Sequence, residues 1–73
     1  TVAAARTILV EAARRFPCEA IIPFNLACYE CRLGHPEQAM AYLKQALSLN
    51  PDLQQVAAED DDLEPLWDQL APD

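Results

Sequence analysis

Glycine and β-branched residues are scarce in this sequence of 73 residues, and long apolar runs are missing. With one glycine and few β-branched side chains, the chain has little of what strands require. No apolar run approaches the roughly 20 residues that a membrane-spanning helix needs. We therefore expect neither a β-sheet nor contact with a membrane.

Basic residues are absent from the last third of the chain. Residues 1–51 carry five bases against four acids, a net charge of +1, whereas residues 52–73 carry eight acids and no base, a net charge of −8. Together they make the −7 of the whole chain. Nucleic acid is not an expected partner, because phosphate contacts need clustered Lys and Arg. A basic partner or plain solubility fits the acidic end.

Alanine makes up much of the apolar content, which amounts to 52% of the residues. Alanine favours helices and lets them approach closely, but it buries little surface per residue. A chain this short forms one small domain and buries only about 60% of the surface that its unfolded form exposes. The composition predicts a single all-α domain.

Three longer helices are expected from the spacing of apolar residues and from the helix breakers. They cover residues 2–16, 20–33 and 36–49. Pro23 is compatible with the second helix only in its first turn, and Gly34 suits the left-handed conformation at its end. The link to the third helix is short, so the second and third should form an antiparallel hairpin. The apolar face expected for the first helix consists of Val2, Ala5, Leu9, Ala12, Ala13 and Phe16.

The last twenty residues are less regular. Residues 53–58 predict a short helix, and apolar spacing over residues 63–70 predicts a final one. An acidic run lies between them, in which Asp61 or Asp62 is the expected N-cap. The final helix should lay Leu66 and Trp67 onto the preceding hairpin.

The chain resembles itself at an offset of 34 positions. The matching pairs are Ala5 and Ala39, Leu9 and Leu43, Ala12 and Ala46, and Pro17 and Pro51. They fall at the buried-face and stop positions of the first and third helices. Such self-similarity marks stacked helical units.

The central stretch resembles the tetratricopeptide repeat family, whose unit of about 34 residues reads W-x2-L-G-x2-Y, then A-x3-F, then P. The corresponding residues here are Pro23, Leu26, Ala27, Glu30, Ala39, Leu43 and Pro51. Pro23 replaces the large aromatic residue and Glu30 the usual tyrosine, and the offset match ends at Asp60. The resemblance implies antiparallel helical hairpins, about four or five helices in all, in a fragment of a right-handed α-solenoid.

By the same resemblance the single domain has three parts. Residues 1–19 are the second helix of a preceding repeat, residues 20–53 a complete repeat, and residues 54–73 a C-terminal capping segment. The chain would then be the closing end of a repeat array. Helical-repeat modules of this family bind other proteins or peptides and are not enzymes.

The resemblance also implies a peptide-binding groove along the first helix of the complete repeat. Its residues would be Ile21, Phe24, Asn25, Cys28, Cys31 and Arg32. An apolar floor with one arginine fits an extended or helical apolar peptide that carries an acid. The alternative is that this stripe is covered by the chain's own end around Leu66, Trp67 and Leu70, or by a second copy.

The cysteines invite a metal or redox interpretation, because Cys28 and Cys31 are followed by His35 and preceded by Cys18. However, the first two lie inside an expected helix rather than on a turn, and no βαβ context for a redox motif is present. The acidic run lacks the glycine of a calcium loop. We expect no metal, no cofactor and no catalytic residue, and the odd cysteine count favours a reducing compartment, the cytoplasm.

The sequence therefore predicts a non-catalytic scaffold that binds a peptide or partner protein. One alternative is a structural cap that self-associates, because the exposed face of the first helix can pair with another copy or with upstream repeats. A minor alternative is a small metal or redox module built on Cys28 and Cys31.

Overall fold

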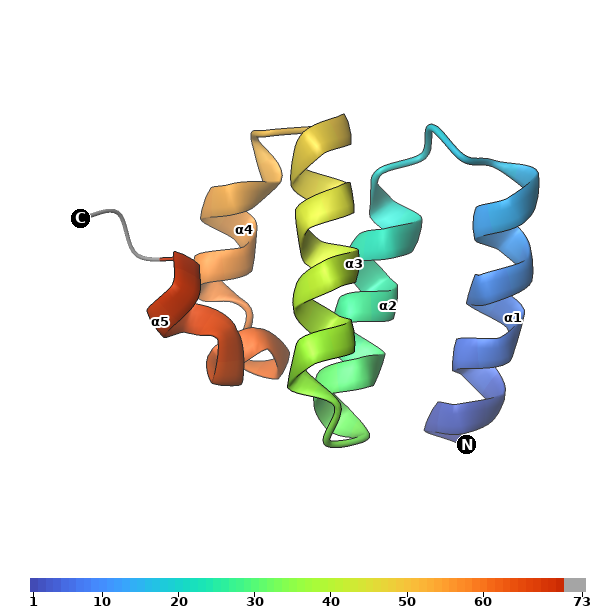
Figure 1. Cartoon of the computed structure of the whole chain (residues 1–73), viewed down its shortest axis with the longest axis horizontal. Coiled ribbons are helices and arrows are strands. Elements are labelled where there is room, and N and C mark those ends of the chain that lie inside the picture. Colours follow the sequence, from blue (N-terminus) through green and yellow to red (C-terminus); the bar gives the residue numbers. More distant parts are fainter. Residues whose placement is uncertain (71–73) are drawn as a thin grey trace.

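The computed structural model describes residues 1–70, which form helices and turns without any strand in that range. In chain order the elements are α1 (Val2–Arg15), α2 (Ile21–Arg32), α3 (Pro36–Leu49), α4 (Leu53–Glu59), the 3-10 helix η1 (Asp61–Leu66) and α5 (Trp67–Leu70). The prediction of an all-α fold is confirmed, with five α-helices in the described range (Figure 1). The first three helices match their expected bounds to within one residue.

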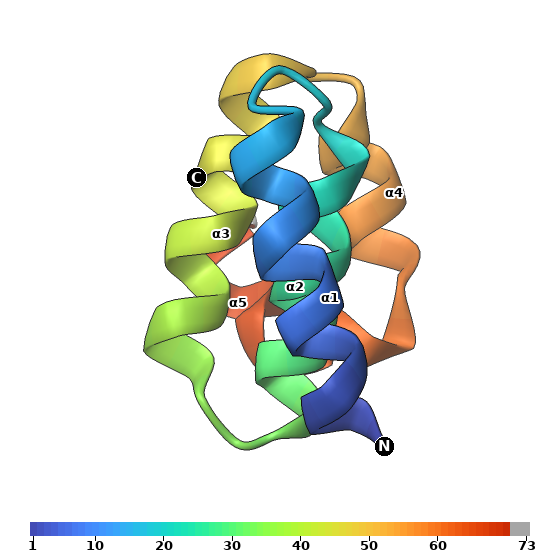
Figure 2. The same cartoon turned by 90° about the vertical axis from the view of Figure 1, so that its right-hand side faces the viewer.

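The molecule measures 35 × 25 × 17 Å. Its helices are arranged in sequence order along the longest of these dimensions. Figure 1 shows α1 at one end, α2 and α3 in the middle, and α4, η1 and α5 at the other end. The view from the α1 end in Figure 2 shows α1 in front of α2. Among the described residues α1 contacts α2 and no other element, whereas η1 contacts both α2 and α3. The two ends of the molecule are thus built from the two ends of the chain.

A Schellman turn joins α2 to α3. The amide of His35 donates to the carbonyl of Glu30 at 2.8 Å, and the amide of Gly34 donates to the carbonyl of Cys31 at 3.1 Å. This pattern requires a left-handed residue, and Gly34 has a φ of +82°. Pro36 then starts α3, where its missing amide hydrogen costs nothing. Gly34 therefore ends α2 and Pro36 starts α3, which gives the expected antiparallel hairpin of these two helices.

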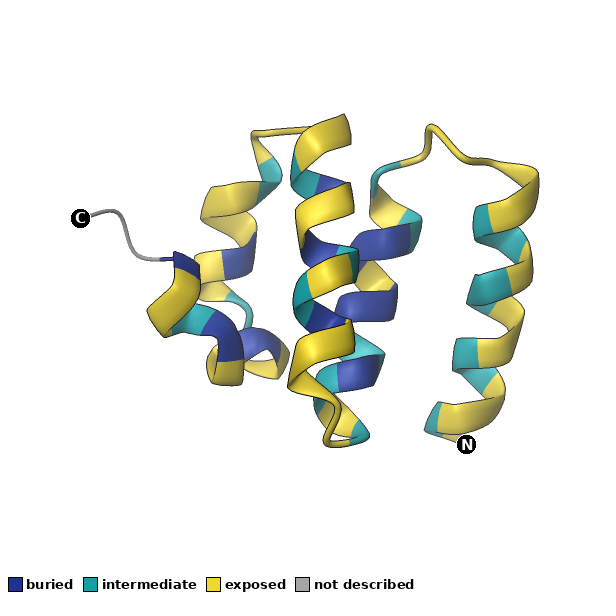
Figure 3. Cartoon of the chain, viewed as in Figure 1, coloured by how far each residue is buried: buried dark blue, intermediate teal, exposed yellow. Residues whose placement is uncertain are grey.

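The core lies between the α2–α3 hairpin and the C-terminal elements, as the buried positions in Figure 3 show. Its buried apolar residues are Phe24, Leu26, Ala27, Ala39, Leu43, Ala46, Ala57, Leu63, Leu66 and Leu70. Three of its alanines, Ala27, Ala39 and Ala46, are fully buried where α2 and α3 meet. Small side chains there let the two backbones approach closely, and the larger leucines fill the remaining space.

The repeated positions differ in burial between α1 and α3. Ala39, Leu43 and Ala46 are fully buried, whereas the matching residues of α1 are only half-buried. The reason is that α3 has neighbours on two sides and α1 has one. Phe16 does not join the expected face of α1: it follows the last helical residue with φ −130° and ψ 68°, and its side chain is 57% exposed.

The C-terminal segment corrects two expectations. A 3-10 helix followed by a single α-helical turn replaces the one final helix over residues 63–70. The N-cap is Asp60, one residue before the two expected acids, and its carboxylate accepts a hydrogen bond from the amide of Asp62 at 3.0 Å. A 3-10 helix rises about 2.0 Å per residue against about 1.5 Å in an α-helix, so η1 spans more distance with few residues.

Replacement of Gly34 tests the turn. We expect Gly34→Ala to lower the free energy of unfolding by about 1 kcal/mol, because alanine is strained at positive φ. No atom lies within 4 Å of the added methyl position, so the loss comes from backbone conformation alone. Urea unfolding measures it, and Gly34→Asn serves as the control with a smaller loss, since asparagine tolerates this region. Equal stability of Gly34→Ala and the unmodified chain would contradict the assignment.

Candidate interaction surfaces

Within residues 1–70 the outer face of α1 has no neighbour. None of the α1 residues is buried, and Ile8 and Phe16 are 70% and 57% exposed. The two side chains border a shallow hollow of about 410 Å³. Its lining residues are Thr7, Ile8, Glu11, Ala12, Arg15 and Phe16. We call this surface the α1 face.

The α1 face exists because α1 is apolar on two sides. Ala5, Leu9 and Ala13 are half-buried, and α2 is the element that α1 contacts. Ile8, one position before Leu9, is exposed. A helix with apolar residues over more than half of its circumference needs two neighbours to bury them. In the described part of the chain, α1 has one neighbour, α2.

A buried carboxylate holds α1 against the hairpin. The side chain of Glu30 is 1% exposed, and its Oε1 lies 2.8 Å from Nε of Arg6 and 3.4 Å from Nδ1 of His35. The hydrogen bond to Glu30 and the charge of this carboxylate raise the pKa of Arg6. Buried carboxylates are rare unless paired, so the pairing with Arg6 makes the burial of Glu30 possible. Sequence reasoning noted the departure at Glu30 but did not find its partner.

The predicted groove on α2 is not a continuous open surface. Its central residue Phe24 is 4% exposed and belongs to the core cluster with Leu63 and Leu66 of η1. This corrects the prediction for Phe24, which cannot contact a partner while η1 packs on α2. The element from the chain's own end that packs on α2 is η1, and Trp67 packs against the same core cluster.

The other predicted groove residues surround this covered centre. Ile21 is 51% exposed, Asn25 and Arg32 are exposed, and Cys28 and Cys31 are half-buried. A small polar cleft of about 210 Å³ remains at the edge of η1. It is lined by Asn25, Cys28, Tyr29, Arg32, Asp60 and Asp62. The cleft combines three of the predicted groove residues with two acids of the acidic run.

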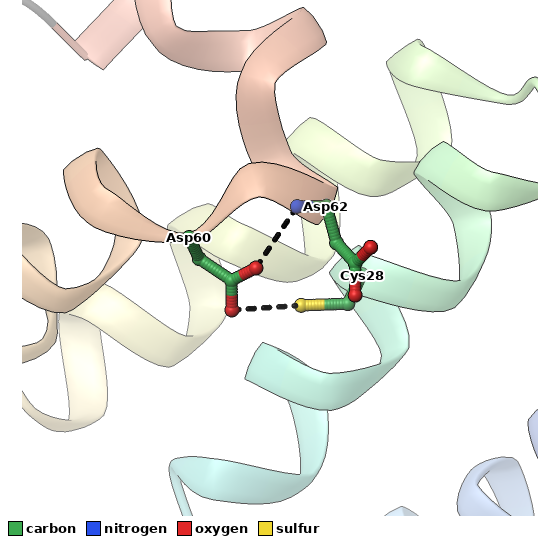
Figure 4. A group of neighbouring side chains, drawn as sticks. All are labelled: Cys28, Asp60 and Asp62. Carbon is green, nitrogen blue, oxygen red and sulfur yellow. Dashed lines mark hydrogen bonds between the residues drawn. The ribbon is translucent and has the colours of Figure 1, made fainter.

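Cys28 faces the start of η1 in this cleft (Figure 4). Its Sγ donates to Oδ2 of Asp60 at 3.8 Å, while Oδ1 of the same carboxylate caps Asp62. Burial, reinforced by the charges of Asp60 and Asp62, raises the pKa of Cys28 to about 12 and also raises the pKa of Cys31. Both thiols are held in the neutral form.

The structure does not bring the three cysteines and His35 together as one set of metal ligands. Within residues 1–70, one atom from each of Cys28, Asp60 and Asp62 lies within 4.8 Å of the others. His35 is bonded instead to Glu30, and Cys18 is exposed in the turn before α2. A cation at the three-residue group would have to displace a thiol proton and the hydrogen bonds of Asp60. The group is explained by the docking of η1 on α2.

A larger hollow lies at the opposite end of the molecule from α1. It measures about 660 Å³ and is lined by Pro51, Asp52, Gln54, Gln55, Ala58, Trp67 and Leu70. Nε1 of Trp67 donates to the carbonyl of Ala57 at 3.0 Å, and Nε2 of Gln54 donates to the carbonyl of Leu70 at 3.4 Å. These bonds fix α5 against α4 and shape the hollow, which sequence reasoning missed because its walls come from two separate helices. We call this surface the α4–α5 hollow.

Comparisons with known proteins found no match to the chain among family models, curated proteins or solved structures. No helix within residues 1–70 has the length and apolar character needed to cross a membrane.

Loss of Arg6 tests how α1 is held. We expect Arg6→Ala to speed hydrogen exchange in α1 more than in α3, because the carboxylate of Glu30 then loses its closest partner. Arg14→Ala is the matched control, since the ion pair of Arg14 with Glu11 is long, at 3.6 Å, and exposed on both sides. Equal exchange in the two variants would show that the buried pair does not anchor α1.

The neutral thiol of Cys28 is tested by alkylation. At pH 8 iodoacetamide should label the exposed Cys18 long before Cys28, because a pKa of about 12 leaves almost no thiolate at Cys28. Asp60→Asn removes a neighbouring negative charge, lowers this pKa and should speed the labelling of Cys28. Asp61→Asn is the control, and mass spectrometry after limited digestion reads each site. Labelling of Cys28 at the rate of Cys18 would contradict the arrangement.

Proposed function

We propose that this chain is a non-catalytic protein-interaction module that binds through the α1 face. The observation that carries the proposal is the exposure of Ile8 and Phe16 beside a hollow on a helix with one neighbour. Exposed apolar residues gathered around a concavity are typical of protein-binding surfaces. The expected partner surface is an amphipathic helix, because α1 offers a straight row of small and medium side chains for helix packing.

The tetratricopeptide resemblance belongs to this proposal. If residues 1–19 are the second helix of a repeat, the first helix of that repeat would lie against α1. The α1 face would then receive an amphipathic helix either from an upstream segment or from another molecule. The half-buried inner residues of α1 and the fully buried matching residues of α3 are consistent with stacked units.

A catalytic or redox role for the cysteines has weaker support. A nucleophilic cysteine needs a depressed pKa and electropositive surroundings. Cys28 lies beside two carboxylates, and its pKa is raised. The polar cleft on α2 is therefore proposed as a structural contact and not as an active site.

A display library of amphipathic helical peptides tests the proposed function. Selected peptides should bind the unmodified chain and lose at least about tenfold in affinity for Ile8→Glu, because the glutamate places a charge in the apolar centre of the contact. Ile21→Glu is the matched control, since Ile21 is 51% exposed on a different helix. Fluorescence anisotropy measures the affinities, and circular dichroism checks that both variants keep their helices. Peptides that bind Ile8→Glu and the unmodified chain equally would overturn the proposal.

A further inference from the structure

We propose that a second copy of this chain is a partner of the α1 face, and that it docks with its α4–α5 hollow. This inference rests on the proposed function and names the partner for the same surface. It is carried by three properties of the described residues: the charges of the two ends, the apolar side chains of the two surfaces, and their placement on opposite sides of the molecule.

The charges at the two ends are complementary. Arg14 and Arg15 are exposed at the C-terminal end of α1, and the weak pair with Glu11 leaves the charge of this end positive. The far end presents exposed acids and no base after residue 51. These acids are Asp52, Glu59, Asp61, Asp62, Glu64 and Asp68. Contact between unlike ends brings the arginines to the acids and guides the approach of the two copies.

The two surfaces also match in apolar character. Ile8 and Phe16 are exposed on the α1 face, and Ala58, Trp67 and Leu70 give the α4–α5 hollow an apolar lining. Asp52 lines the same hollow. The hollow can therefore receive an apolar side chain and an arginine together, and Arg15 and Phe16 are adjacent in the sequence.

The placement of the surfaces determines the kind of assembly. They lie at opposite ends of the long axis (Figure 1), so one copy cannot cover its own α1 face with its own hollow. A two-fold contact between two α1 faces would leave the arginines of α1 away from the acids of the far end. A head-to-tail contact does not close and produces short chains of copies, whose growth the net charge of −7 opposes.

Sedimentation velocity over a range of concentrations tests the inference, in a buffer with reductant so that disulfides between free cysteines do not form. We expect the average mass to rise with concentration and to exceed that of a dimer at the highest concentrations. Ile8→Glu should weaken the association at least about tenfold, and the control Ile21→Glu should leave it unchanged. A chain that stays monomeric at all concentrations would overturn the inference.

A mixing experiment tests the head-to-tail geometry. Ala58→Arg changes an exposed residue of the hollow and should abolish association by itself. Ile8→Glu keeps an intact hollow and Ala58→Arg keeps an intact α1 face, so their equimolar mixture should form heterodimers and nothing larger. If Ala58→Arg associates as the unmodified chain does, the copies pair through another surface and the inference is wrong.

These outcomes are separate from the peptide selection above. A monomeric chain whose α1 face still binds selected peptides leaves the proposed function standing and removes only the second copy as partner. A monomeric chain without such peptides removes both. When both hold, a selected peptide should compete with the second copy and return the assembly to monomers.

Discussion

The close contact of α2 with α3 is the constraint on which the rest of the structure depends. Ala27, Ala39 and Ala46 are fully buried at this contact, and a larger side chain at any of them would push the helices apart. The hairpin so formed presents two further surfaces, one to α1 and one to the C-terminal elements. Each end of the molecule is an addition to this central pair, and each is attached by a different kind of contact.

The attachment of α1 is partly polar, which distinguishes it from the apolar packing at the other end. Glu30 is the one buried charged residue among residues 1–70, and Arg6 satisfies it. A buried ion pair adds less stability than apolar packing of the same volume does. Its stabilisation is lost when one of the two partners is removed. Such an attachment agrees with the proposal that α1 has a further partner, because the exposed outer face of α1 becomes buried only when a partner covers it.

The C-terminal elements pack on the hairpin, and they also carry most of the acidic residues of the chain. Leu63 and Leu66 are buried in one core cluster with Phe24, while the acids between α4 and Leu63 remain near solvent or cap η1. The result is a molecule with an apolar, arginine-rimmed end and an acidic end that carries a hollow. The two proposals name alternative occupants of the same α1 face, a helix from another protein and a second copy of the chain.

The sequence by itself determined the helical class, the first three helices and the turn at Gly34, because these depend on signals that act within one or two helical turns. The tertiary structure decided what happens at Phe24, Glu30 and Cys28. Phe24 is buried in one cluster with leucines from η1, Glu30 is paired with a residue 24 positions away, and Cys28 contacts a carboxylate 32 positions away. Local periodicity cannot reveal such contacts, because they depend on how η1 crosses α2 and on which neighbours each helix has.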